Sequence, residues 1–480
     1  MSSHTKSRRI YIHTIIMFVL MIGIGFLPPF AQITALGMKV LGIFVGTLYG
    51  WLFIDLLWPS LIGLVGLGLS GIMTIDEAFS AALSNSTGIQ VIITCVFAGA
   101  LSKIGAVDVV SNWMLTRKSL QKNPWLLIIA LFLTVLVGTL LGAGIALVFM
   151  LWALVLKAAD TCGYKRSDPL VGFIMVMAVI LCFTASQMLP FRGAALMFLA
   201  FFTPTAGAMP YIPYMIFMLI YVVLFVIVMM LIAKFLIKID VTGFHLPKEE
   251  ITRIQAQKIT TAQKFGCIIM VAFVVCMFLP TLLPKSWGIT HFLSTLGLLG
   301  VSTIALMLMA LIHDENGKRI VKLADCHGSV PWDIVWLICA TMPLANALES
   351  KESGIMATIV STLQPLLSTM SPYVLMMAAM IVLGLLTQVT HNLVLGALFI
   401  PFLTELCLNM NANAYAFFMI LIITFNCAYV TPAASMQSAL IHGNPDIGTK
   451  TAYTWGIAAL LVSWIILAVI ALPLGNLLFQ

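Results

Sequence analysis

Apolar runs as long as a membrane-spanning helix recur along nearly the whole chain, and they restrict its fold more than any other feature. One of them, YMIFMLIYVVLFVIVMMLIA, covers residues 214–233. About 20 such residues, wound as a helix, cross the hydrocarbon core of a bilayer. Only 9% of the 480 residues are charged, whereas soluble domains carry about 25%. Since backbone groups in lipid must be satisfied within their own segment, the sequence predicts an all-α integral membrane protein.

The positions of these runs and of the basic residues predict a topology. Most of the 24 Lys and Arg residues lie in loops on the side of the N-terminus, and such an excess marks the cytoplasmic face. We therefore expect a cytoplasmic N-terminus, a retained first helix rather than a signal peptide, and an external C-terminus. The basic residues behind the formal charge of +7 therefore fix the orientation of the protein in the membrane, and no nucleic-acid partner is expected. About eleven transmembrane helices are predicted, from runs beginning near 10, 36, 58, 88, 169, 211, 264, 291, 331, 413 and 450.

Two further apolar regions are predicted to be re-entrant helical hairpins. The stretch between Lys122 and Lys157 is uncharged, and as one helix it would be about 50 Å long. The hydrocarbon core is only about 30 Å thick. Basic residues flank both ends, so the segment is expected to enter and leave on the same side. A second hairpin is expected over 372–408, where the polar residues TQVTHN interrupt an apolar run at 387–392.

The two halves of the chain are similar to each other. ITCVFAGALSKIGAVDVVS at 93–111 and LICATMPLANALESKESGIMATIVS at 337–361 are each followed by a hairpin and then by a span broken at a proline. Because the halves start from opposite sides, they are predicted to be inverted repeats, which in transporters place the substrate near the membrane midplane. The expected organisation is scaffold helices at 1–87, a first repeat at 88–238 (hairpin 124–160, broken helix 169–203), a cytoplasmic linker at 239–263, and a second repeat at 264–480 (hairpin 372–408, broken helix 413–441).

Polar residues within these spans are the candidates for a binding site, because they are costly in lipid unless they face a cavity or a partner. Hairpin tips and helix breaks present positive helix ends to anions and freed carbonyls to small cations. Arg192 lies inside a span, where an arginine costs roughly 2.5–3.5 kcal/mol. It either snorkels to the interface or pairs with a buried carboxylate, or it serves the site, by binding a substrate carboxylate or by supplying the positive charge of a bound cation. His391 is either a packing residue or a proton carrier and substrate donor, and Thr387 and Asn392 either join helices or line the site.

Enzymatic chemistry is not predicted. The eight histidines are dispersed, and neither an H-E-x-x-H motif nor a phosphate-binding glycine loop occurs. None of the nine cysteines forms a C-x-x-C pair, so they are read as packing residues. An integral membrane enzyme acting on lipid is the alternative from another class, and it would require the clustered acidic or histidine residues that this chain lacks.

The pattern from VLGIFVGTLYGWLF near the start to YVTPAASMQSALIHGN near the end resembles the divalent anion/sodium symporter family of the ion transporter superfamily. Members carry Ser-Asn-Thr triplets at two hairpin tips, the second often written T-E-x-x-S-N-T. The matching residues here are Thr387, Gln388 and, in place of the triplet, His391-Asn392-Leu393, with Pro401 downstream and Thr431-Pro432 at the second helix break. By spacing, the first triplet falls at Gly142-Ala143-Gly144, which lacks side-chain ligands.

The resemblance implies a secondary transporter of small organic anions, working as a homodimer in which a hairpin-bearing domain slides like an elevator against a scaffold. It also implies sodium as the only cofactor, held by Thr387 and Asn392. In the family the triplets help hold sodium ions, and we expect Arg192 to replace in part, electrostatically, the sodium ion at the first triplet. Succinate, citrate, tartrate and sulfate are alternative substrates, and arsenite transport or sodium/proton exchange occurs elsewhere in the superfamily. Coupling by sodium or protons, and symport or exchange, stay open. The expected substrate-binding residues are Gly142, Ala143, Gly144, Arg192, Thr390, His391, Asn392, Thr431 and Pro432.

Overall fold

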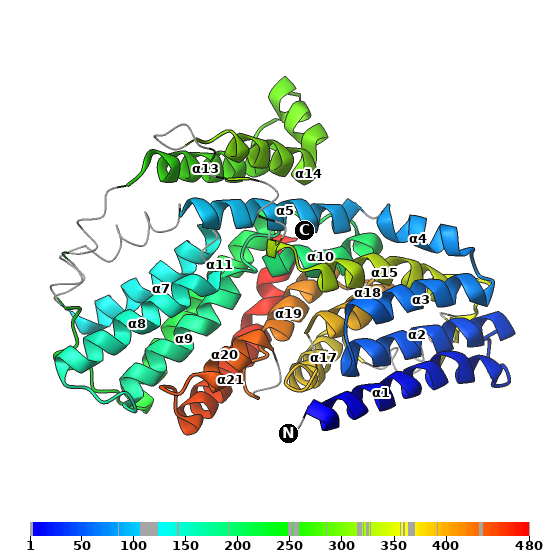
Figure 1. Cartoon of the computed structure of the whole chain (residues 1–480), viewed down its shortest axis with the longest axis horizontal. Coiled ribbons are helices and arrows are strands. Elements are labelled where there is room, and N and C mark those ends of the chain that lie inside the picture. Colours follow the sequence, from blue (N-terminus) through cyan, green and yellow to red (C-terminus); the bar gives the residue numbers. More distant parts are fainter. Residues whose placement is uncertain are drawn as a thin grey trace.

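Helices make up nearly all the regular structure of the chain. The computed structural model describes residues 3–84, 86–105, 123–141, 144–191, 193–247, 252, 259–284, 286–313, 319, 321–322, 326, 328–355, 357–358, 361–362, 370–390, 392–431 and 435–479. Within these ranges the one departure from helices, turns and loops is a β-bridge between His313 and Arg319. The predicted all-α fold class is therefore confirmed (Figure 1).

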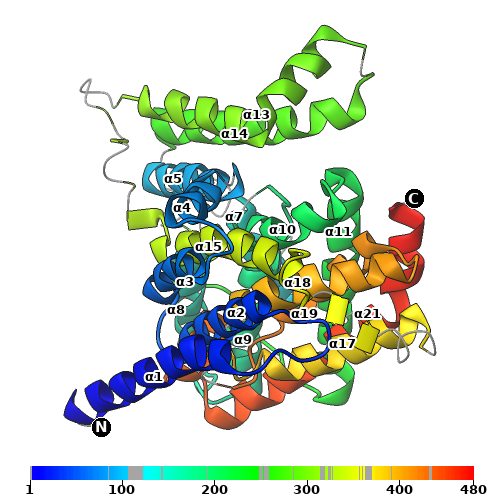
Figure 2. The same ribbon diagram turned by 90° about the vertical axis from the view of Figure 1, so that its right-hand side faces the viewer.

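Five helices open the chain: α1 (Ser3–Gly23, followed by the 3₁₀ turn η1, Ile24–Phe26), α2 (Ala35–Phe53), α3 (Leu57–Ser70), α4 (Ile75–Leu83) and α5 (Ser86–Ile104). Side-chain caps set two of their starts. The Thr34 hydroxyl accepts the Gly37 N–H ahead of α2, and Thr74 and Glu77 cap each other's backbone N–H ahead of α4. Each cap satisfies a donor that has no partner within the first helical turn. Helices α1, α2 and α3 then pack in sequence (Figures 1 and 2).

The next segment contains a helix pair and an interrupted helix. Helices α7 (Pro124–Leu141) and α8 (Gly144–Cys162) contact each other, and both pack against α9 (Pro169–Ala185). Proline stands at the first position of α9, where its missing N–H costs no hydrogen bond. After a break, α10 (Gly193–Ala206) continues, followed by α11 (Tyr211–Leu231) and its π-helical end η3 (Ile232–Leu236).

The last part of the chain has the same order of elements as the segment from α7 to α11: a helix pair followed by an interrupted helix. Helices α17 (Pro372–Leu386) and α18 (Asn392–Asn409) both pack against α19 (Ala414–Asn426), which ends at a break before α20 (Met436–Gly443). The long helix α21 (Thr449–Leu478) closes the fold. Between the two parts lie α13 (Thr261–Leu282), α14 (Gly288–Ala310) and α15 (Trp332–Glu349); α13 and α14 pair beside α5 at one edge of the molecule (Figure 2). The inverted orientation of the two parts and the domain boundaries stay predictions.

Several helices are long and apolar enough to cross a membrane. Among the described residues five qualify, and a sixth span arises if the bent pair 75–83 and 88–101 is counted as one. The five are Ala35–Phe53, Tyr211–Leu236, Gly288–Ala310, Asn392–Asn409 and Thr449–Leu478. Most of the other expected spans coincide with shorter apolar helices, such as Pro169–Ala185 and Ala414–Asn426. The count of eleven crossings stays a prediction.

Helices α9 and α19 form the centre of the helical bundle. Nearly every residue of both is buried, on all sides of the helix, and a helix that is apolar all round belongs inside a bundle. The two helices contact each other, and α21 packs against both. Since both end at a break, the two breaks are buried in the middle of the molecule.

Polar contacts join the loops at the far ends of these helices. The Tyr164 hydroxyl donates to the Thr242 carbonyl at 2.8 Å. Partial burial and the Asp240 carboxylate raise the pKa of Tyr164, so its phenol keeps its proton at neutral pH. Arg166 binds Asp446 at 3.1 Å. Both side chains of that ion pair remain partly exposed to water, 55% for Arg166 and 23% for Asp446, so it contributes little to stability.

Candidate functional site

The broken end of α19 meets the polar residues that follow α17. Thr387 is fully buried and Gln388 is 6% exposed, and both reach the backbone of the break. The Thr387 hydroxyl lies 3.4 Å from the Phe425 carbonyl and 3.4 Å from the Asn392 side-chain oxygen. The Thr431 hydroxyl donates to the backbone carbonyl of Gln388. Residues 387–390 and Asn392, here called the second tip, therefore lie against the break.

The Gln388 side chain bridges the two segments. Its Nε2 group donates to the Gly384 carbonyl at 2.8 Å and to the Cys427 carbonyl at 2.9 Å. Its Oε1 atom accepts the Val430 N–H at 3.1 Å. One amide thus satisfies two carbonyls and one N–H that the ends of α17 and α19 leave free.

Side-chain donors satisfy the carbonyls of this break almost one by one. A helix end leaves carbonyls without intrahelical partners, and buried carbonyls must find donors elsewhere. The acceptors are the carbonyls of Phe425, Asn426, Cys427, Ala428, Val430 and Thr431, and their donors are, in the same order, Thr387, Gln437, Gln388, Ser435, His442 and Ser438. Because a carbonyl oxygen has two lone pairs, an acceptor with a single donor keeps capacity for one further contact, whereas the Cys427 carbonyl also accepts the Tyr429 N–H at 3.1 Å.

The two breaks also contact each other. The Asn426 amide lies 3.4 Å from the Thr184 hydroxyl near the end of α9, and α20 packs against α9. The side-chain oxygens of Gln187 and Gln437 are both buried, at 1% exposure each, and neither has a hydrogen-bond partner among the described residues. Buried acceptors of this kind are costly, and they are available to a cation or to a ligand that donates a hydrogen bond.

The predicted site residues fall into two groups. Thr390 donates to the Leu386 carbonyl at 2.7 Å, and Asn392 begins α18 in the same hydrogen-bonded cluster as Thr387 and Thr431. Gly144 begins α8. The remaining ones, Gly142, Ala143, Arg192, His391 and Pro432, lie outside the described residues.

Sequence reasoning missed several residues that build the site. Gln388 stands in the motif without a predicted role, and nothing in the pattern indicates Gln187, Gln437 or His442. One signal was present: Ser is a preferred residue at the N-cap of a helix, and Ser435 does cap α20. The contacts of Gln388 with Cys427 and Val430 join residues 39 and 42 positions apart, which no local pattern encodes.

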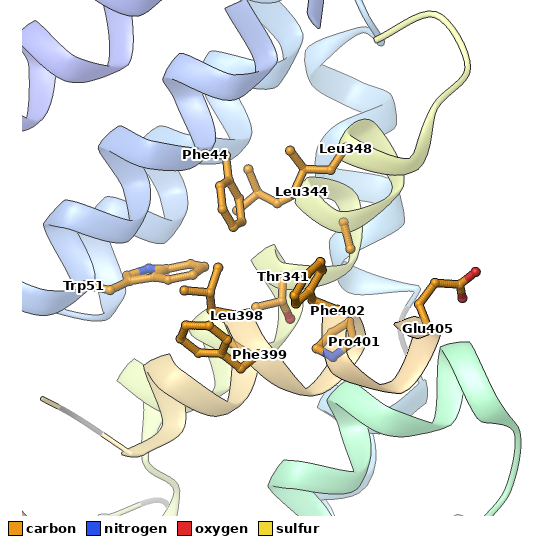
Figure 3. Close-up of a pocket in the computed structure, with 12 residues that line it drawn as sticks. Phe44, Trp51, Thr341, Leu344, Leu348, Leu398, Phe399, Pro401, Phe402 and Glu405 are labelled. Carbon is orange, nitrogen blue, oxygen red and sulfur yellow. The ribbon is translucent and has the colours of Figure 1, made fainter. Parts of the chain in front are cut away.

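A separate apolar cavity lies where α18 meets α2 and α15 (Figure 3). Its volume is about 190 Å³. Aromatic and aliphatic side chains line most of it, including Phe44, Trp51 and Leu398, and Glu405 stands at its edge. This cavity is distinct from the polar tip and break, because its residues on α18 begin at Ala397.

A helical membrane protein in which a polar turn between two helices meets a broken helix inside the bundle has the construction of a secondary transporter. The family model for citrate transporters (CitMHS) matches residues 40–395. The chain therefore belongs to the citrate transporter family, whose members are transporters rather than enzymes. This confirms the resemblance drawn from the sequence.

Curated relatives point to the same class of protein. The chain is 23% identical over 206 residues to the sodium-dependent dicarboxylate transporter SdcS of Staphylococcus saprophyticus, covering 42% of this chain and 39% of that protein. For SdcS of Staphylococcus aureus the identity is 23% over 186 residues, with coverages of 39% and 35%. An uncharacterized transporter of Synechocystis is 23% identical over 123 residues, with coverages of 26% and 20%. The chain thus spans about two fifths or less of the length of these relatives.

Proposed function

We propose that this protein is a secondary active transporter of small organic anions, of the di- and tricarboxylate class that includes succinate, citrate and tartrate. The observation that carries the proposal is the hydrogen-bonded cluster of the second tip and the α19 break, buried in the middle of a protein of the citrate transporter family. Polar groups at this depth are costly without a ligand to serve.

The proposed substrate site is formed in part by helix N-termini, which carry partial positive charge. Helix α8 begins at Gly144, α10 at Gly193 and α18 at Asn392. The N-terminus of a helix attracts carboxylates through its free N–H groups and its dipole, and Arg192 precedes α10 in sequence. We assign the substrate carboxylates to these ends and to the side chains beside them: Gly142, Ala143, Gly144, Arg192, Thr390, His391, Asn392, Thr431 and Pro432.

The proposed coupling ion is sodium, held by Thr387, Asn392 and the Phe425 carbonyl. The Thr387 hydroxyl is 3.4 Å from each of the other two oxygens, which is long for an O–H···O hydrogen bond. Two oxygens that bind one hard cation at about 2.4 Å and at right angles lie about 3.4 Å apart. The dicarboxylate transporters of Staphylococcus that the chain is similar to are described as sodium-dependent.

We further propose that transport follows an elevator mechanism in a homodimer, with a cytoplasmic N-terminus and an external C-terminus. The part that slides carries α18, and the fixed part carries α2 and α15. The lining that these helices share is almost entirely apolar (Figure 3). An interface with few directional hydrogen bonds can slide at low cost.

Uptake into proteoliposomes tests the proposal. The purified protein would be reconstituted and offered radiolabelled succinate, citrate, tartrate and sulfate, with an inward sodium gradient, an inward proton gradient or neither. We expect uptake of at least one carboxylate, driven by the sodium gradient and reduced at least tenfold in Thr387→Ala. Uptake of sulfate alone would overturn the substrate class, and uptake driven only by protons would overturn the sodium assignment.

A further inference from the structure

Gln388 uses every polar atom of its side chain to hold the second tip against the α19 break. Both hydrogens of Nε2 are donated to carbonyls, one on α17 (Gly384) and one at the end of α19 (Cys427). The Oε1 atom accepts from Val430, and the backbone carbonyl of Gln388 accepts from Thr431. With only 6% of the residue exposed, these contacts are shielded from water.

This arrangement requires a group that donates twice and accepts once. A primary amide does so, whereas an ionised carboxylate only accepts hydrogen bonds. A glutamate at this position would place a carboxylate oxygen against two carbonyl oxygens, where the amide nitrogen now lies within 2.9 Å of both. A buried charge without a donor is strongly unfavourable. A protonated glutamate has one donor and restores part of the arrangement.

The groups around the amide leave it without a compensating charge. The break, whose backbone binds the amide, carries the titratable side chains of Cys427 and Tyr429. On α20, His442 binds the Val430 carbonyl at 2.9 Å. Helices α17 and α19 contain no Asp, Glu, Lys or Arg. The charged residue of α18 is Glu405, near the end away from the break, and that of α21 is Lys450, whose side chain is exposed. A carboxylate at position 388 therefore has no nearby cation among the described residues.

We propose that Gln388 is a positioning residue of the transport site, which keeps Thr387 and Asn392 against the break and must be a neutral donor to do so. The side chain itself does not contact the transported anion, because its polar atoms are all engaged by backbone groups. Its role in transport rests on the proposed function, while its role in holding the tip does not.

The test replaces the amide by groups of the same size. Gln388→Glu and Gln388→Met would be compared with wild type and with Gln32→Glu, an identical chemical change at an exposed side chain. Sodium-driven uptake and melting temperature would be measured from pH 5.5 to 7.5. At pH 7.5 we expect the uptake by Q388E to be at least tenfold lower than the uptake by wild type. As the pH falls, both the uptake and the melting temperature of Q388E should approach the wild-type values. Q388M should stay folded but take up little anion at any pH, and Q32E should follow wild type.

The outcomes separate this inference from the proposed function. A folded Q388E whose uptake and melting temperature follow the wild-type pH profile would overturn the inference, as would wild-type uptake by Q388M. A wild-type protein that transports none of the anions would instead overturn the proposed function. In that case the acid recovery of the Q388E melting temperature still tests whether a neutral donor holds the tip.

Discussion

At the scale of single residues, hydrogen-bond donors rather than packing hold the break after α19 in shape. His442 is one of them: its Nε2 group lies 2.9 Å from the Val430 carbonyl. Since a carbonyl only accepts, this nitrogen must carry the proton. Val430 in turn gives its N–H to Gln388, so His442 and the second tip hold opposite sides of the same residue.

Replacing His442 tests this role. Phenylalanine keeps the ring but cannot donate, so the Val430 carbonyl loses its donor, and we expect His442→Phe to destabilise the fold by about 1–3 kcal/mol. Glutamine offers an amide donor of comparable reach, so His442→Gln should keep most of the stability. The measurement is the unfolding transition in detergent. Equal stability of the two variants would show that the hydrogen bond is unimportant.

The sequence predicted some of these residues and not others, for a physical reason. Thr387, Asn392 and Thr431 could be selected because polar side chains within an apolar run are costly and need a purpose. The roles of Gln388 and His442 depend on which carbonyls lie opposite them. That depends on how α17, α19 and α20 pack, and hydropathy carries no information about it.

At the scale of helices, the long apolar elements were well placed by the sequence. The run expected near 169 is α9, and the run expected near 211 is α11. The short helix α4 was not anticipated, although the pattern of Thr74 followed by Glu77 is a capping box that predicts its start. Which helices pack together could not be predicted, because small residues allow many close approaches.

One such close approach, between α10 and α18, predicts the effect of adding a methyl group to a glycine. A Cβ atom on Gly396 would lie 2.6 Å from the Phe198 ring, so Gly396→Ala must push α18 away from α10. We expect it to lower stability by about 1–3 kcal/mol, measured by thermal or denaturant unfolding. The matched control is Gly23→Ala in α1, where a Cβ would meet nothing within 4 Å. A G396A protein as stable as G23A would contradict the close packing of these helices.

At the scale of the whole molecule, the cavity between α18 and the pair α2 and α15 tests whether one part slides against another. Phe44 on α2 and Leu398 on α18 both line it (Figure 3). In a protein whose nine native cysteines are replaced, we expect a bifunctional thiol reagent to join Phe44→Cys to Leu398→Cys. If these helices must move past each other, this cross-link should reduce uptake at least tenfold.

The control cross-link joins helices that belong to the same part. His13 on α1 and Tyr49 on α2 are hydrogen-bonded at 2.8 Å, and a cross-link between cysteines at these positions should leave uptake unchanged. Full uptake by the protein joined between positions 44 and 398 would rule out sliding at this interface.

The donors that surround the α19 break also determine when it can be completed during biosynthesis. Thr387 and Gln388 precede the break in the chain, whereas Ser435, Gln437, Ser438 and His442 follow it. While the ribosome has delivered only α19, four of the six carbonyls have no donor, and bare carbonyls are poorly tolerated in lipid. Helix α19 should therefore leave the translocon only together with α20, so that the pair inserts as one unit.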